Sequence, residues 1–224
     1  GTFNTVYREY GTRVVKTLRT SIITDPPDGR IPSRTPAAAE KRRQSIERQR
    51  RMENPEDLSL QDRCVAFTTS GPPMLPYTYN SNYQIVQAPG YVMILAEMIH
   101  DARVIPLDGR ESPPTGTRQW IGLSRGRWEG ETLVVETSNF NAKNPFRGSS
   151  EQMTVLERFT RVAEDTIAYE FTVDDPGTWD RPWTAEMPMS RTRGPLFEFA
   201  CHEGNYGLYH TLVGARLEEE QAAA

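Results

Sequence analysis

The sequence predicts a mainly β, single-domain protein. We expect an antiparallel, lipocalin-like β-barrel, with a sandwich as the alternative, and three observations favour this fold class. Apolar and polar residues alternate with a period of two in much of residues 83–203, which is typical of strands with one buried face. Short turn signals divide these runs into hairpins. No helical pattern lies between the runs, which argues against a parallel sheet.

The chain divides into four segments. We expect an N-terminal arm at residues 1–36, a helical segment at residues 37–69, the barrel at residues 70–210 and a tail at residues 211–224. The arm holds a short strand, and Thr35 followed by Pro is typical of an N-cap and a first helical position. The helix that follows is rich in Arg and Lys and has few apolar residues, so we expect it to face solvent.

The strands of the barrel are separated by recognisable turns. Turn signals at residues 89–90, 129–131 and 163–165 each lie between two apolar runs. After the last of these turns, Tyr169 belongs to an apolar face and Glu170 to the opposite face. The last two strands are expected at residues 183–189 and 196–203.

Composition excludes some classes of function. The formal net charge of −4 does not indicate a nucleic-acid-binding surface. No apolar run approaches the roughly 18 residues of a membrane span. Cys64 and Cys201 are the only cysteines, and they are either one disulfide of an exported protein or two buried thiols.

The sequence lacks the motifs of the easily recognised enzyme classes, such as a nucleophile elbow or a phosphate-binding loop. Several carboxylates nevertheless lie inside apolar strands, where they could line a cavity with raised pKa values and act as general acids or bases. The alternative is that each faces water on the polar side of its strand. These residues are Glu97, Glu136, Glu157, Glu170 and Glu186.

Two histidines stand beside carboxylates at expected strand ends. His100 precedes Asp101, and His202 precedes Glu203. Either histidine could transfer protons near neutral pH, or could simply be satisfied by local hydrogen bonds. His100, His202 and Glu203 also form an acceptable metal-ligand set, although we expect no cofactor.

Arginine and aromatic residues are candidates for substrate binding. Arg103, Arg118 and Arg147 could hold a carboxylate or hydroxyl groups. Aromatic walls for a ring-shaped ligand could come from Tyr83, Trp120 and Trp128.

Several strings resemble a known family. DPPDGRIP, NYQIVQ, IHDAR and CHEGNY are similar to segments of a family of exported proteins of soil and aquatic bacteria, and the similarity extends along nearly the whole chain. The resemblance implies export and a single domain, and it implies no particular activity. The family pattern has Asp at the position of Leu123, so this chain lacks that carboxylate.

Three functions compete at this level. The first is an exported, periplasmic or secreted enzyme that performs acid–base chemistry, as a lyase, hydratase, isomerase or hydrolase, on a small organic or sugar-like molecule. Its proton carriers would be His100 and His202, with Asp101 orienting and Glu136 or Glu170 as the second group. The second is a barrel that binds a small apolar or aromatic ligand without turnover. The third is an interaction protein, and the sequence leaves the oligomeric state open.

Overall fold

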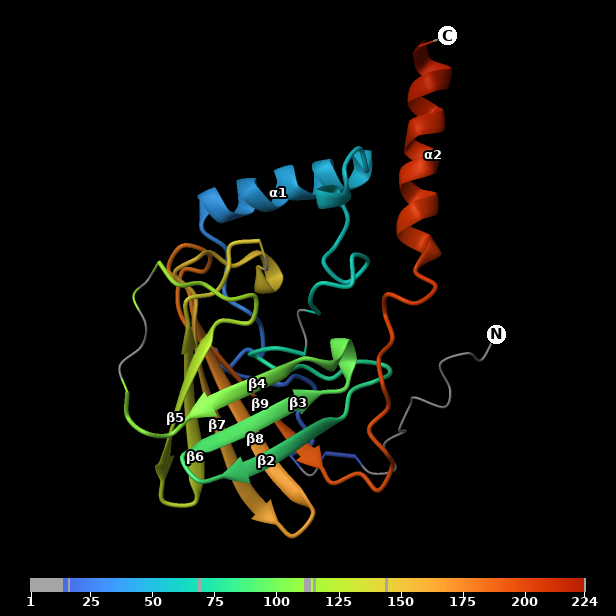
Figure 1. Cartoon of the computed structure of the whole chain (residues 1–224). Coiled ribbons are helices and arrows are strands. Elements are labelled where there is room, and N and C mark those ends of the chain that lie inside the picture. The colour runs from blue at the N-terminus through green and yellow to red at the C-terminus, as the bar shows by residue number, and fades with distance from the viewer. Residues whose placement is uncertain are drawn as a thin grey trace.

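The computed structural model describes residues 14–15, 17–67, 70–110, 114, 116–143 and 145–223. It contains two antiparallel sheets and two longer helices (Figure 1). The larger sheet has the strand order β1-β9-β8-β7-β6-β5, and the smaller has the order β2-β3-β4. Consecutive strands from β5 to β9 are neighbours, so this part of the chain is a plain meander.

The strands of the larger sheet are β1 (Ile23–Asp25), β5 (Leu123–Glu129), β6 (Thr132–Ser138), β7 (Thr154–Ala163), β8 (Thr166–Asp174) and β9 (Trp183–Ser190). Those of the smaller sheet are β2 (Tyr83–Ala88), β3 (Tyr91–Ala96) and β4 (Ala102–Pro106). The helices are α1 (Pro36–Arg51) and α2 (Tyr206–Ala223), with short 3₁₀ turns η2 (Pro55–Asp57), η3 (Met98–His100) and η4 (Phe146–Gly148).

The expectation of a barrel is wrong, because the two sheets do not close on each other. β4 runs beside β5, but no hydrogen-bonded ladder joins them. The reason lies at Gly126 of β5, where a Cβ atom would meet the side chains of Ile105 and Leu107 at 2.8 and 2.7 Å. Side chains of β4 and of the residues after it therefore pack against the β5 backbone, where a barrel would have backbone pairing.

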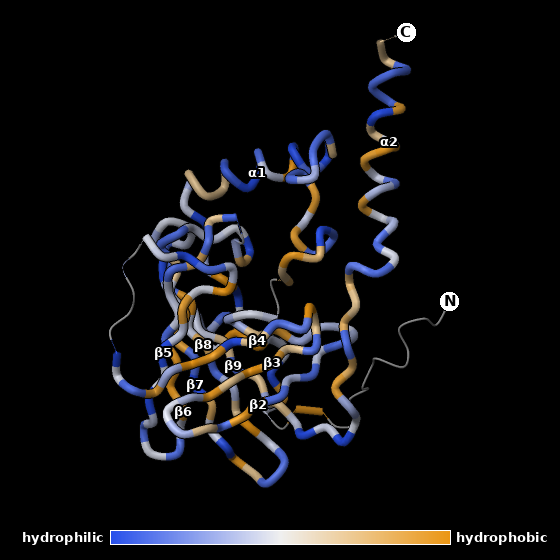
Figure 2. The backbone as a smooth tube through the Cα atoms, viewed as in Figure 1, coloured by the Kyte–Doolittle hydropathy of each residue, from blue (hydrophilic) through white to orange (hydrophobic). Residues whose placement is uncertain are grey.

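The sheets face each other across one shared core. Val92, Ile94 and Ile105 of the smaller sheet are buried with Val135 and Phe171 of the larger sheet in a single apolar cluster. The alternation expected from sequence is visible along the strands, where apolar and polar segments follow each other closely (Figure 2). The antiparallel prediction is therefore confirmed, with the core between two sheets.

Local signals predicted most of the elements correctly. Thr35 caps α1, since its hydroxyl accepts a hydrogen bond from the Ala38 amide at 3.2 Å, and Ala38 is the one buried residue in that helix. The predicted turns at residues 89–90, 129–131 and 163–165 all join neighbouring strands. The strand expected at residues 196–203 is absent, because that segment has no partner strand and runs as irregular backbone.

The C-terminal helix α2 extends away from the two sheets (Figure 1). It has 18 residues, none of them buried, and it begins earlier than the tail predicted at residues 211–224. Immediately before it, Cys201 forms a disulfide with Cys64. The disulfide alternative is therefore confirmed, and the bond is compatible with an oxidising, extracytoplasmic location.

None of the helices in the described part of the chain is long and apolar enough to cross a membrane.

Candidate functional site

The facing sides of the two sheets carry their side chains in three layers. Successive inward-facing residues on a strand are two positions apart, about 6.6 Å along the strand. On β7 these residues are buried Val155, then Glu157, Phe159 and Arg161, and the last three belong to the three layers. On β2 they are Tyr83, Ile85 and Gln87. Each strand thus proceeds from a buried polar group, through an apolar residue, to a polar residue beside a hairpin turn.

The innermost layer, which we call the deep polar layer, is built around a buried ion pair. The two terminal nitrogens of Arg103 donate to the two carboxylate oxygens of Glu157 at 2.6 and 3.1 Å. The side chains of Arg103 and Glu157 are 6% and 0% exposed. The Tyr169 hydroxyl donates to Glu157 at 2.8 Å and accepts from the Met74 amide at 2.9 Å. Every charged group in this layer is therefore compensated within the protein.

Burial changes the titration of the tyrosines in the deep polar layer. Loss of solvent raises the pKa of Tyr83 above its ordinary value, and the nearby positive charge of Arg103 only partly opposes this. Burial and the negative charge of Glu157 raise the pKa of Tyr169 well above its ordinary value. Both hydroxyl groups therefore stay protonated at neutral pH, and they act as hydrogen-bonding groups there.

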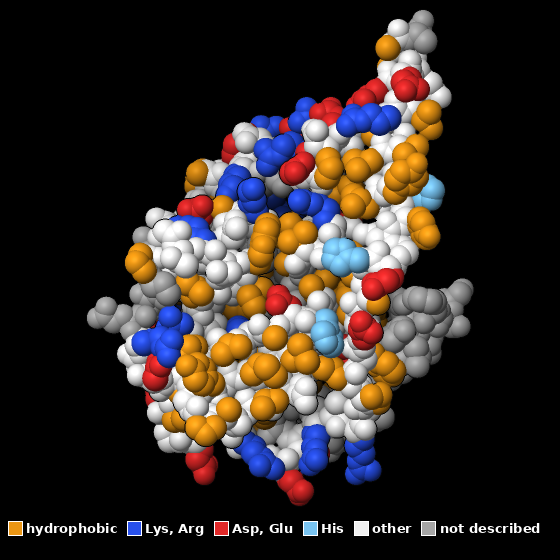
Figure 3. Space-filling view, in the orientation of Figure 1, with side chains coloured by type: hydrophobic (Ala, Val, Ile, Leu, Met, Phe, Trp, Pro, Cys, Tyr) orange, Lys and Arg blue, Asp and Glu red, His pale blue; other side chains and the backbone are white. Residues whose placement is uncertain are grey.

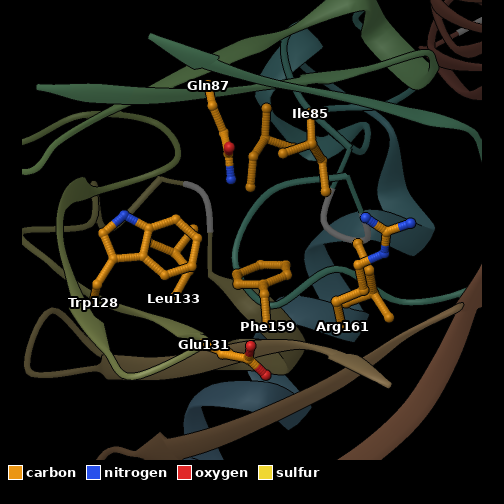
Figure 4. A pocket seen from close by; sticks show the side chains of 9 residues that line it. Ile85, Gln87, Trp128, Glu131, Leu133, Phe159 and Arg161 are labelled. Carbon is orange, nitrogen blue, oxygen red and sulfur yellow. The ribbon is translucent and has the colours of Figure 1, made fainter. Parts of the chain in front are cut away.

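Above the deep polar layer lies a cavity of about 140 Å³ between the sheets. Its walls form the apolar layer, which consists of Ile85, Ile94, Trp128, Leu133, Phe159 and Ile167. Figure 4 shows Ile85 extending from β2 toward the Phe159 and Leu133 side chains of the larger sheet, with Trp128 at one side. The Phe159 ring lies 4.9 Å from the Tyr169 ring, so it separates the cavity from the deep polar layer.

Three polar residues, Gln87, Glu131 and Arg161, complete the lining, and we call them the rim. They lie next to the hairpin turns β2–β3, β5–β6 and β7–β8, at the end of the sheets that is lowest in Figure 1. All three are exposed. The cavity is therefore apolar inside and polar at its edge, which is a common arrangement in small-molecule sites.

The predicted histidines lie outside this cavity. None of the residues that line it is a histidine. His100 is exposed at the end of η3, with a left-handed φ of 58°, and His202 is exposed in the irregular segment before α2. Histidine side chains lie in separate patches on the face shown in Figure 3. Because residues 196–203 are not a strand, His202 is not at a strand end as expected.

The metal option also lacks support. Within the described ranges, no three His, Cys, Asp or Glu side chains gather closely enough to hold a metal ion, so His100, His202 and Glu203 do not form such a group. Asp101 lies between η3 and β4, away from the cavity lining. Partial burial raises its pKa above the ordinary value, and a hydrogen bond from the Ala102 amide partly opposes the shift.

Two predicted carboxylates point away from the space between the sheets. Glu136 is exposed on β6, where its neighbours in sequence, Val135 and Thr137, are buried. Glu170 lies between buried Tyr169 and Phe171 on β8, so its side chain is on the outer face of the sheet. For these two residues the structure matches the alternative interpretation, a polar strand face.

The predicted substrate-binding residues are scattered. Arg103 has both terminal nitrogens on Glu157, and Tyr83 lies beside this pair. Arg118 holds together two loops, because it donates to the Phe140 carbonyl at 3.0 Å and pairs with the Glu151 carboxylate at 3.0 Å. Arg147 and Trp120 do not line the main cavity.

Arg147 is exposed in η4, and its carbonyl accepts from Arg34 at 2.5 Å. Trp120 borders a hollow of about 10 Å³, which holds one water molecule at most. Of the predicted binding residues, only Trp128 lines the main cavity.

Arg161, Glu131 and the amides that hold Glu97 were not expected from the sequence, and Glu157 was expected only as one of five candidate carboxylates. Glu157 was among the carboxylates noted, yet its position between Val155 and Phe159 on one face already indicated that it points inward. The Arg161 and Glu131 side chains belong to the same inward-facing rows, close to the turns.

Glu97 is a second buried carboxylate, at 0% exposure, and it is held by the side-chain amides of Asn80 and Asn82 at 2.6 and 3.1 Å. No motif in the sequence indicated that these two amides would hold Glu97.

Comparisons of the chain with protein-family models, with curated proteins and with solved structures find no match.

Proposed function

We propose that the protein binds a small apolar or aromatic molecule in the cavity between its sheets, without chemical turnover. The observation that carries this proposal is the apolar layer, which encloses about 140 Å³ between Ile94, Leu133 and Phe159. Apolar cavities of about 150 Å³ hold a benzene-sized molecule without water. The space therefore suits one six-membered ring or a short branched chain.

The side chains around the cavity favour a ring. The Trp128 indole and the Phe159 ring both border the space, and aromatic rings gain energy from offset or edge contacts with each other beyond simple burial. Trp128 is 47% exposed, so a ligand beside it would remove apolar surface from water.

Acid–base catalysis has less support from this geometry. The groups expected to move protons, His100, His202, Glu136 and Glu170, do not line the cavity. Glu157 lies near it, but both of its oxygens accept hydrogen bonds from Arg103, and the Phe159 ring stands between. The one carboxylate among the residues that line the cavity is Glu131, which lies at the exposed rim, so a ligand in the apolar layer would have no acid–base pair beside it.

The place of action that we propose is the periplasm or the outside of the cell. The disulfide between Cys64 and Cys201 supports this, because such bonds persist in oxidising compartments. The similarity of the DPPDGRIP and CHEGNY strings to an exported family points in the same direction.

The test is binding of fluorobenzene, followed by fluorine NMR. We expect a dissociation constant on the order of 0.1–1 mM, as for a ligand with few heavy atoms. Ile167→Trp should fill the cavity and weaken binding at least about tenfold. The matched control is Val104→Trp, since Val104 is 56% exposed on the outer side of β4. Equal binding to both variants, or no binding to the parent protein, would contradict the proposal.

A further inference from the structure

The rim carries a positive charge that is held in place by the backbone. Arg161 donates from Nε to the Ala163 carbonyl at 3.2 Å and from Nη2 to the Glu164 carbonyl at 2.9 Å. Both acceptors belong to the β7–β8 hairpin from which Arg161 itself extends. The guanidinium group is thus oriented before any ligand arrives, and less conformational entropy is lost when it binds one.

This charge has no carboxylate partner in the part of the chain that the structure describes. Among the described residues, no carboxylate lies within ion-pair distance of Arg161, whereas the neighbouring Arg158 pairs with Glu129 at 3.0 Å. A guanidinium group has five N–H donors, and the two backbone carbonyls use two of them. The remaining donors include both N–H groups of Nη1 and one N–H group of Nη2. These two nitrogens can donate two parallel hydrogen bonds to one carboxylate.

The position of Arg161 relative to the cavity sets the shape of a ligand. Arg161 follows Phe159 on the inner face of β7, and it lies opposite Ile167 in the register of β7 with β8. Both of these neighbours belong to the apolar layer. A molecule whose ring occupies the apolar layer would therefore direct a short substituent toward Arg161.

We propose that the ligand is an amphipathic anion: a single apolar ring, or a branched chain of about six to eight carbon atoms, that carries a carboxylate. The ring lies between Ile94 and Phe159, and the carboxylate accepts hydrogen bonds from Arg161. Gln87 also lies on the rim. This proposal rests on the proposed function and names the chemical class that the same cavity selects.

Glu131 is the feature that opposes an anion. It also lies on the rim and would repel a carboxylate or attract an ammonium group. Glu131 extends from the two-residue turn between β5 and β6, and no hydrogen bond among the described residues holds its carboxylate, whereas two hold Arg161. The oriented charge dominates recognition, and Glu131 moderates the affinity for the anion.

The experiment compares three ligands that share one ring and differ in head group: phenylacetate, phenethyl alcohol and phenethylamine. Dissociation constants are measured by NMR titration on the intact, oxidised protein. We expect phenylacetate to bind about tenfold more tightly than phenethyl alcohol, the effect of hydrogen bonds to a charged group at a partly exposed site. Phenethylamine should bind most weakly.

Variants assign the effect to the rim. Arg161→Gln should abolish the preference for phenylacetate over phenethyl alcohol, and Arg161→Lys should retain part of the preference. Glu131→Gln should strengthen phenylacetate binding. The matched control is Arg158→Gln, which removes an arginine from the outer face of the same strand and should change none of the three affinities. Thermal midpoints confirm that each variant is folded.

The outcomes separate this proposal from the proposed function. If all three ligands bind equally, or phenethylamine binds best, the cavity binds apolar rings but the anionic class is wrong. If Arg161→Gln and Arg158→Gln reduce phenylacetate binding equally, the rim is not the recognition site. If no ligand binds to the parent protein, the proposed function itself fails, and the anion proposal fails with it.

Discussion

Removing the charge of Glu157 should be one of the most destabilising single-residue changes in this protein. In Glu157→Gln the two Arg103 nitrogens, now at 2.6 and 3.1 Å from carboxylate oxygens, face an amide that can match only one of them. The Arg103 side chain is 6% exposed, so water cannot reach the nitrogen that has lost its acceptor. Breaking a buried pair in this way costs about 3–5 kcal/mol. That is a large fraction of the roughly 5–15 kcal/mol that stabilises a typical domain.

The assay is equilibrium unfolding in urea with the disulfide intact, followed by tryptophan fluorescence. Trp179 and Trp183 are 2% and 1% exposed in the core, so their emission reports on the packed sheets. Glu129→Gln is the matched control, because the Glu129 carboxylate pairs with Arg158 at the surface, where both side chains are more than a third exposed. We expect the control to leave the free energy of unfolding nearly unchanged, because solvent screens an exposed ion pair.

A double variant tests the cause. Replacing both partners, as Arg103→Met with Glu157→Leu, removes the unpaired charge and should cost only about 1–2 kcal/mol, chiefly for the Tyr169 hydroxyl that loses its acceptor. The reasoning is refuted if Glu157→Gln costs no more than Glu129→Gln. It is also refuted if the double variant costs as much as the two single changes added together.

Three further predictions follow from buried or bonded groups. Replacing Cys64 and Cys201 by Ser, which opens a loop of 137 positions, should lower the free energy of unfolding by about 5 kcal/mol, measured in urea against the oxidised parent. Burial raises the pKa of Asp101 in the folded state, so this residue favours folding at low pH, and its contribution is lost as pH rises through the folded-state pKa. At neutral pH the buried charge is therefore unfavourable, and Asp101→Asn should raise the thermal midpoint. An unchanged midpoint would contradict this prediction.

Burial raises the pKa of Tyr83 above its ordinary value of about 10, so the folded state holds a proton that the unfolded chain releases above pH 10. The free energy of unfolding should therefore fall as pH rises above 10, and it should fall less steeply in Tyr83→Phe. Equal dependence of the unfolding free energy on alkaline pH in the two proteins would contradict this prediction.

Local structure was predictable where the signal lies within a few neighbouring residues. The cap at Thr35 and the hairpin turns are examples, because a side chain that accepts a nearby amide, or a glycine that adopts a left-handed φ such as Gly90, needs no distant partner. The fold class followed from these turns and from alternation. Closure of the sheet did not, because it depends on how Ile105 and Leu107 meet Gly126 far along the chain.

The candidate site was only partly predictable. Alternation already separated Tyr169 from Glu170 on β8, and the structure places the first inside and the second outside. The same logic applied to β7 assigns Glu157 to the interior, but it does not name Arg103, which approaches from the other sheet. The cavity could not be predicted from the sequence, because its volume is the space left between the side chains of two sheets.

The disulfide also changes what a protease can do to this molecule. Cys64 and Cys201 close a covalent ring that contains β2 to β9, and so contains the whole cavity lining. A single cut in any loop of that ring, for example in the exposed turn after Ala163, leaves both fragments linked through sulfur. α1 and α2 lie outside the ring and can be trimmed away. A nicked molecule would therefore keep together the two sheets that border the cavity until a reductant reached the bond.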